Sequence, residues 1–181
     1  MAETPEDLQR LLALVQGFRA TQVTYVVAKL GLADRLAKSA LTAAELASIV
    51  NVNADALRRV LRLAAYYGLV AEVGGERFEL TRIGRPLAAD ARGSVKATAI
   101  MLGEEHYRAW GDLMHSVKTG EPAFDHVFGA PFFDYMAAHP KTQATFDAAM
   151  SSGADVFFAS LADCYEFSKS TWAEATALCR Q

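Results

Sequence analysis

Histidines are the first candidates for chemistry in this sequence, and their spacing matches no common metal-binding motif. His106, His115, His126 and His139 include no pair four residues apart, and no cysteine or carboxylate set of metal-ligand spacing adjoins them. We therefore expect no metal site. His115 lies where a helix end is expected and has the chemistry of a base, although a lone helical histidine is more often only packed or exposed.

Serine and cysteine side chains give no stronger signal for nucleophilic catalysis. Ser151-Ser152-Gly153 lacks the strand-to-helix context that a nucleophile elbow needs. Cys164 and Cys179 have no partner cysteines or nearby histidines, so both are interpreted as free thiols. We assign no catalytic residue to this chain.

Aromatic and methionine side chains are dense in the second half of the chain. Core packing explains such a set, and a flat apolar pocket for an aromatic ligand is the alternative, because methionines adapt to a ligand's shape. The set comprises Trp110, Met114, Phe124, Phe128, Phe132, Phe133, Tyr135, Phe146, Met150, Phe157 and Phe158. From the residues alone, core packing is the favoured interpretation.

Length, composition and charge limit the possible functions. With 181 residues, 52% of them hydrophobic, the chain can bury a substantial core. Its net charge of −3 gives no general attraction to nucleic acid or to anionic membranes. No apolar run reaches the roughly 20 residues of a spanning helix, and the acidic start lacks the basic flank of a signal peptide. We expect a cytoplasmic protein with no membrane partner.

Apolar residues at helical spacing predict the elements that position these side chains. Residues 8–36 form two helices and a short third, with Gly31 suited to cap the second. A long helix is expected over residues 93–118, stopped by Gly120. Two more helices follow, each opened by a proline, over residues 131–138 and 140–163.

Residues 42–68 predict a helix-turn-helix. Thr42 and Glu45 have the form of a capping box, and Asn53 is suited to cap the second helix. The expected inner face of the first helix consists of Leu46, Ile49 and Val50.

Residues 69–80 predict a β-hairpin, because Gly74-Gly75 is a two-residue turn signal between extended segments. The expected pairs are Ala71 with Phe78 and Leu69 with Leu80 on the buried face, and Glu72 with Arg77 on the other. A helix-turn-helix followed by such a hairpin is a winged helix. Thr81 is expected to cap the short helix that leaves it.

DNA binding is one possible function of a winged helix. Arg58, Arg59 and Arg62 lie on the second helix of the helix-turn-helix, where a transcription regulator contacts bases. Residues 42–87, however, carry six arginines against five acidic residues, a net charge of +1, and three of the acids lie in the hairpin. An acidic wing repels phosphate. A DNA-binding transcription regulator therefore stays the alternative, and we expect no nucleic-acid partner.

Ordered short motifs carry the strongest signal, and they span residues 10–168. They are Leu30-Gly-Leu-Ala-Asp-Arg-Leu-Ala, Leu41-Thr-Ala-Ala-Glu-Leu-Ala, Leu57-x-Arg-x-Leu-Arg, Leu80-Thr-x-x-Gly84, Trp110-x-x-Leu-x-x-Ser-Val-Lys-Thr-Gly-Glu-Pro-Ala-Phe124, Val127-Phe-Gly, Phe132-Phe-Asp-Tyr-Met, Pro140, Phe146-x-x-x-Met150 and Tyr165-x-Phe-Ser168. Together they resemble the N-terminal region of S-adenosylmethionine-dependent small-molecule O-methyltransferases. These are the plant caffeate and hydroxyindole type and the actinomycete polyketide-tailoring type.

The resemblance implies a mainly α fold and an intertwined homodimer. Residues 1–92 would be a helical dimerisation domain in which the winged helix is a scaffold, and residues 93–168 a helical linker that covers the substrate. Complete family members transfer a methyl group from S-adenosylmethionine to a phenolic or polyketide hydroxyl in secondary metabolism. The expected partner is therefore a small aromatic acceptor.

The resemblance also implies a set of substrate-binding residues. Phe146 and Met150 would face the acceptor or the methyl-donor region, and Trp110 with Met114 would border the same cleft.

Residues 169–181 depart from the family, which has a cofactor-binding strand and glycine-rich turn there. So few residues cannot build a βαβ unit of about 30 residues. We therefore expect no Rossmann-like catalytic domain and no binding of S-adenosylmethionine by this chain alone. The chain is expected to be an inactive, truncated form of the enzyme, and a non-catalytic helper subunit is the alternative. Residues Ser170 to Ala177 can be written with codons that end in G or C. If the same bases are read in the frame that starts one base earlier, they encode Asp-Val-Gly-Gly-Gly-His-Gly, which has the form of the family's cofactor-binding strand and turn. This match predicts a reading-frame shift.

Overall fold

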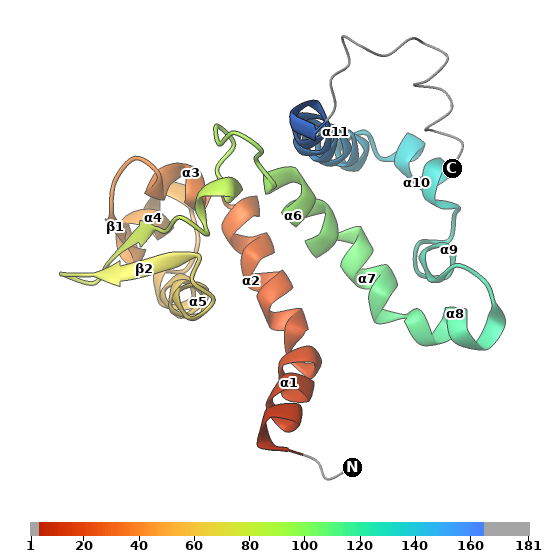
Figure 1. Ribbon diagram of the computed structural model, residues 1–181, viewed down its shortest axis with the longest axis horizontal. Coiled ribbons are helices and arrows are strands. Elements are labelled where there is room, and N and C mark those ends of the chain that lie inside the picture. The colour runs from red at the N-terminus through yellow and green to blue at the C-terminus, as the bar shows by residue number, and fades with distance from the viewer. Residues whose placement is uncertain (1–3, 165–181) are drawn as a thin grey trace.

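The computed structural model describes residues 4–164 of the chain (Figure 1). The fold is mainly α-helical with one small antiparallel sheet, as predicted. The expected aberrant tail at residues 169–181 and the motif that begins at Tyr165 lie outside the described residues.

Three helices open the chain, as the apolar spacing predicted. They are α1 (Pro5–Val15), α2 (Gly17–Lys29) and α3 (Leu32–Leu36). Gly31 adopts φ +63°, a left-handed conformation that favours glycine and lets the chain turn between α2 and α3.

Two helices across a short turn follow, α4 (Ala43–Val50) and α5 (Ala54–Tyr66). The capping box is confirmed, since the Glu45 amide donates to Thr42 Oγ1 at 3.1 Å and the Thr42 amide donates to the Glu45 carboxylate at 2.7 Å. Asn53 caps α5 as predicted, because its Oδ1 accepts from the Ala56 amide at 2.8 Å.

The predicted hairpin forms in a different register. Its strands are β2 (Val70–Val73) and β3 (Arg77–Leu80), and Val70 pairs with Leu80, Ala71 with Glu79, Glu72 with Phe78 and Val73 with Arg77. The predicted pairs of Leu69 with Leu80, Ala71 with Phe78 and Glu72 with Arg77 are therefore wrong. The cause is the turn, which also includes Glu76 at φ +58° next to Gly75 at φ +76°.

A third strand, β1 (Leu41–Thr42), pairs with β3 and gives the antiparallel order β1-β3-β2. Sequence patterning did not predict it, because two residues are too few to show an alternation. After the sheet, Thr81 Oγ1 accepts from the Gly84 amide at 3.1 Å and donates to the Gly68 carbonyl at 2.5 Å. Thr81 thus caps the exit turn as predicted, although the helix is only the 3-10 turn η1 (Arg85–Leu87).

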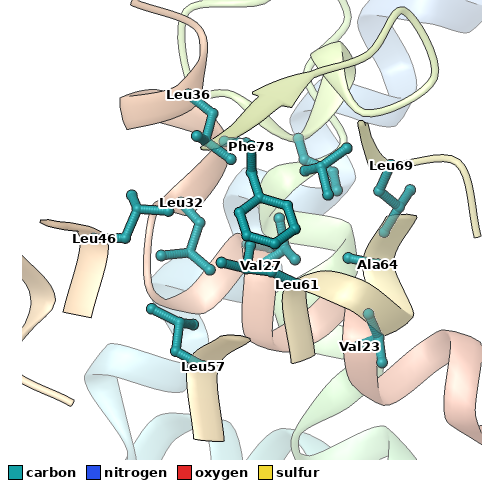
Figure 2. Close-up of a cluster of buried hydrophobic side chains, with 14 of the residues drawn as sticks. Val23, Val27, Leu32, Leu36, Leu46, Leu57, Leu61, Ala64, Leu69 and Phe78 are labelled. Carbon is teal, nitrogen blue, oxygen red and sulfur yellow. The ribbon is translucent and has the colours of Figure 1, made fainter. Parts of the chain in front are cut away.

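The hydrophobic core lies between the sheet and helices α2 to α5. Phe78 points into its centre, where Val27, Leu32 and Leu61 surround it (Figure 2). Ile49 was expected to join this core but is half exposed. The buried stripe of α4 instead follows Ala43, Leu46, Ala47 and Val50, which recur at i, i+3, i+4 and i+7.

The long helix predicted over residues 93–118 is divided into three: α6 (Lys96–Gly103), α7 (Glu105–Gly111) and α8 (Leu113–Thr119). The backbone leaves the helical conformation at Glu104 and at Asp112. At the first break the side-chain Nε2 of Gln22 donates to the Gly103 carbonyl at 3.1 Å, and the Tyr25 hydroxyl donates to the Glu104 carboxylate at 3.0 Å. Hydrogen bonds to α2 therefore hold the chain at this break.

Three further helices complete the described chain: α9 (Ala123–Phe128), α10 (Phe132–Ala138) and α11 (Pro140–Cys164). The helix α9 was not predicted, whereas α10 and α11 follow their prolines as expected. Helix α6 lies between α2 and α11 and packs against both (Figure 1). The division at residue 92 into two units stays a prediction.

A charged link joins α3, the exit from the sheet and α6. Lys96 Nζ lies 2.5 Å from Asp34 Oδ2, and the Ala89 amide donates to Asp34 Oδ1 at 2.6 Å. Burial raises the pKa of Asp34, but the Ala89 amide and Lys96 outweigh it and leave the pKa below its ordinary value. Asp34 therefore stays ionised and holds these three segments together.

Substituting Gly103→Ala tests the packing of α2 on α6. A Cβ at Gly103 would overlap the Tyr25 side chain, so we expect the free energy of unfolding to fall by about 1–3 kcal/mol, measured by urea unfolding. Gly111→Ala is the matched control, because nothing lies within 4 Å of its added Cβ. Its stability should be unchanged or slightly higher. Equal losses in both variants would contradict the close packing.

Candidate functional site

Aromatic side chains gather where α9, α10 and α11 meet the α6–α7 junction. Phe132 is central, with its ring centroid 5.0 Å from that of Phe124 and 5.3 Å from that of Phe146, both edge to face. It also lies 5.7 Å from His106 and 5.2 Å from Phe133. The predicted site residue Phe146 is therefore part of this cluster.

The cluster continues along α9 and α10. Phe128 lies 4.5 Å from Phe124 and 4.8 Å from Tyr135, measured between ring centroids. The Arg108 guanidinium lies 4.6 Å from the centre of the Phe128 ring, within reach of a cation–π interaction. We call Phe124, Phe128, Phe132, Tyr135 and Phe146 the aromatic platform.

The other predicted site residues are exposed at the surface, and the structure does not bring Trp110 and Met114 together with Phe146. The exposed fractions are 67% for Trp110, 61% for Met114 and 48% for Met150. Met150 follows Phe146 by one turn of α11. Trp110 and Leu113 line a shallow hollow of about 140 Å³ that reaches Ala123, the residue before Phe124. Within residues 4–164 the Trp110 ring contacts no ring of the platform.

Two residues that sequence reasoning gave no role lie at the same junction. The Nδ1 atom of His106 is buried and has no hydrogen-bond partner among the described residues. Burial lowers the pKa of His106, although the Glu105 carboxylate opposes this shift. Glu105 itself accepts from Thr142 Oγ1 at 3.1 Å, which ties α7 to α11. A neutral imidazole thus faces the aromatic platform.

A polar contact between α2 and the α6–α7 junction holds the platform in place. Besides Tyr25, Lys29 contacts Glu104, with Nζ 2.5 Å from Oε1. Burial, together with the hydrogen bond to Glu104, raises the pKa of Tyr25 to about 12. Tyr25 therefore remains a hydrogen-bond donor at neutral pH.

Two of the three arginines of α5, Arg58 and Arg62, pair with acids of the hairpin. Arg58 Nη2 lies 2.7 Å from Glu76 Oε1, and Arg62 Nε lies 3.5 Å from Glu72 Oε2. Both pairs are largely solvent-exposed, so they add little stability. They do place negative charge beside the helix that would read DNA.

A large apolar surface runs along α1 and into α2. No residue of α1 is buried, and Leu11, Leu14, Val15 and Phe18 recur at i, i+3, i+4 and i+7. The most exposed of these side chains is Leu14, at 79%. Within residues 4–164 no single helix is long and apolar enough to span a membrane; α1 and α2 reach that length only as a pair bent by 44°. A cytoplasmic location stays a prediction.

A Rossmann-type cofactor site, which the resemblance implies for complete family members, consists of a parallel βαβ unit whose glycine-rich turn opens a helix. The sheet of the described residues is antiparallel and three-stranded, and none of its strands ends in such a turn. Residues 4–164 therefore do not form a Rossmann-type site for S-adenosylmethionine.

Comparison with known proteins shows that this chain is similar to the first half of several methyltransferases. A family model for the O-methyltransferase dimerisation domain matches residues 12–90. The phenazine O-methyltransferase PhzM of Lysobacter antibioticus is 39% identical over 158 residues, which are 87% of this chain and 46% of that protein.

Solved structures agree with this relationship. The structure of LaPhzM superposes with a TM-score of 0.83 and 38% identity over 88% of this chain and 48% of that chain. The O-methyltransferase NcsB1 from neocarzinostatin biosynthesis, in complex with S-adenosylmethionine and 2-hydroxy-5-methyl naphthoic acid, gives a TM-score of 0.71 and 29% identity over 82% of this chain and 46% of that chain. The chain spans about half the length of these relatives.

Substituting Phe132→Ala tests the packing of the platform. Because Phe132 joins α9 to α11, we expect the free energy of unfolding to fall by about 2 kcal/mol, measured by urea unfolding. Phe133→Ala is the control on the same helix, since Phe133 is mostly exposed, and it should lower stability by less than about 1 kcal/mol. A larger loss for Phe133→Ala would mean that the platform does not depend on Phe132.

Proposed function

Residues 12–90 belong to the O-methyltransferase dimerisation-domain family, and from this premise we propose that the chain is the dimer-forming and acceptor-binding part of a small-molecule O-methyltransferase. The complete enzyme would transfer a methyl group from S-adenosylmethionine to a phenolic or polyketide hydroxyl in secondary metabolism. The observation that carries the proposal is the aromatic platform, which α6 joins to the dimerisation domain.

A flat aromatic acceptor fits this platform by its chemistry. Edge-to-face rings present an apolar surface with partly exposed methionines beside it, and such surfaces bind planar rings and adapt to their shape. The relatives support the same class, because one is a phenazine O-methyltransferase and another is solved with a hydroxynaphthoic acid. We propose that Trp110, Met114, Phe146 and Met150 contact the acceptor.

The cofactor belongs, in this proposal, to the complete family enzyme. One of the related structures contains S-adenosylmethionine, whereas residues 4–164 of this chain form no Rossmann-type site for it. The chain alone is therefore proposed to be inactive, and a helper role beside a complete methyltransferase stays the alternative.

The winged-helix unit is proposed to act as a scaffold. A transcription regulator needs free basic side chains on the second helix of this unit to contact phosphates and bases. Here Arg58 and Arg62 are paired with Glu76 and Glu72 of the hairpin. These pairs support the scaffold over the DNA-binding alternative.

Homodimerisation is expected through the apolar surface of α1 and α2. Light scattering of the purified chain should give twice the mass of one chain, because a monomer would leave this surface in water. The double variant Leu11→Asp, Leu14→Asp should be monomeric, whereas Tyr66→Ser, which changes an exposed aromatic residue of α5, should stay dimeric. A wild-type monomer at micromolar concentration would contradict the proposal.

Acceptor binding is tested with the methionine methyl groups as probes. We expect 2-hydroxy-5-methyl naphthoic acid to shift the ¹³C-methyl NMR signals of Met114 and Met150, because both are proposed to contact the acceptor and both side chains are exposed. Met101 and Met136 are buried and serve as internal controls, so their signals should move little. Phe146→Ala should weaken the response of Met150. Shifts confined to Met101 and Met136, or none at saturating ligand, would contradict the assigned acceptor surface.

A further inference from the structure

Two histidines and an aspartate meet where α8 and α9 pack together. Asp112 precedes α8, His115 lies in its first turn, and His126 lies on α9. Each offers one ligand atom, and these three atoms all lie within 4.8 Å of one another. The spacing along the sequence predicted no metal site, and this grouping arises only because α8 and α9 fold against each other.

The geometry within this group is close. His126 Nδ1 lies 2.7 Å from Asp112 Oδ2. The rings of His115 and His126 stack with their centroids 3.9 Å apart and their planes 8° from parallel. Glu121 stands beside them, with Oε2 4.0 Å from His115 Nε2. Two imidazoles therefore lie together between two carboxylates.

We propose that Asp112, His115 and His126 bind a divalent transition-metal ion. Two neutral imidazoles with a carboxylate form a donor set typical of Zn²⁺, and Glu121 or water would complete four-fold coordination. Ligand atoms of a tetrahedral zinc lie about 3.4 Å apart, given bond lengths near 2.1 Å. The metal would take the place of the hydrogen-bonding proton between Asp112 and His126. Because an imidazole nitrogen binds a metal in the plane of its ring, the His126 ring must turn out of its stack on His115, and the His126 side chain is exposed enough to do so.

The ion would fix the angle between α8 and α9. Phe124 and Phe128 of the aromatic platform also lie on α9, so the site would stiffen one edge of the platform. Coordination does not require that the platform bind an acceptor, and the site therefore stands apart from the proposed function.

Calorimetric titration of the full chain with ZnCl₂ tests the site, with any purification tag removed. All titrations use a chain that carries both Cys164→Ser and Cys179→Ser, because thiolates would otherwise compete for zinc. We expect one ion per chain, and Co²⁺ should give the visible absorption of a site with nitrogen and oxygen ligands. His126→Ala should weaken zinc binding by about tenfold or more, since loss of a ligand costs at least as much as loss of a residue that supports one.

His139→Ala is the matched control, because His139 stacks on Tyr135, away from the cluster, and should leave the zinc affinity unchanged. Circular dichroism confirms that each variant is folded, and His115→Ala gives an independent test if His126→Ala does not fold. The absence of saturable zinc binding would overturn the proposal. Equal affinities of wild type, His126→Ala and His115→Ala would overturn it as well.

Discussion

The close approach of α2 and α6 at Gly103 is the constraint on which the rest of the structure depends. A side chain at this position would overlap Tyr25, and Gln22, Tyr25 and Lys29 use the same contact to bind the backbone of Gly103 and the carboxylate of Glu104. Because α6 packs on both α2 and α11, this contact fixes α11 and the aromatic platform relative to the core around Phe78. The break after Gly103 then directs α7 and α8 away from the sheet (Figure 1).

Apolar side chains are buried in some parts of the chain and exposed in others, and the exposed ones bear on the proposed function. The core around Phe78 is complete, with buried side chains from α2 to β3. In contrast, α1 buries none of its residues, and large apolar side chains of α7 and α8 are exposed. Surfaces of this kind mark interaction sites in folded proteins. In the proposed function, a second copy of the chain covers the surface of α1, and a flat acceptor binds beside the platform.

Local sequence signals predicted local structure well. The Thr42 capping box, the Asn53 cap and the turn at Gly31 depend on neighbouring residues, and all three are confirmed. One error arose where distant contacts decide the outcome, at Glu104, where hydrogen bonds to α2 hold the helix break. The other is local, because the hairpin turn includes Glu76 in a left-handed conformation that non-glycine residues rarely adopt. The same contrast holds for the candidate sites. A sequence motif identified Phe146, which lies in the platform. The cluster of Asp112, His115 and His126 could not be predicted, because it forms only when α8 packs on α9.

We propose that a second copy of the chain holds α1 in place, because no residue of α1 is buried within one chain. Hydrogen–deuterium exchange at several protein concentrations tests this directly. If a second copy covers α1, the amides of α1 exchange more slowly as the protein concentration rises, while those of α5, whose buried face lies within one chain, exchange at a constant rate. Exchange in α1 that is fast and independent of concentration would contradict it.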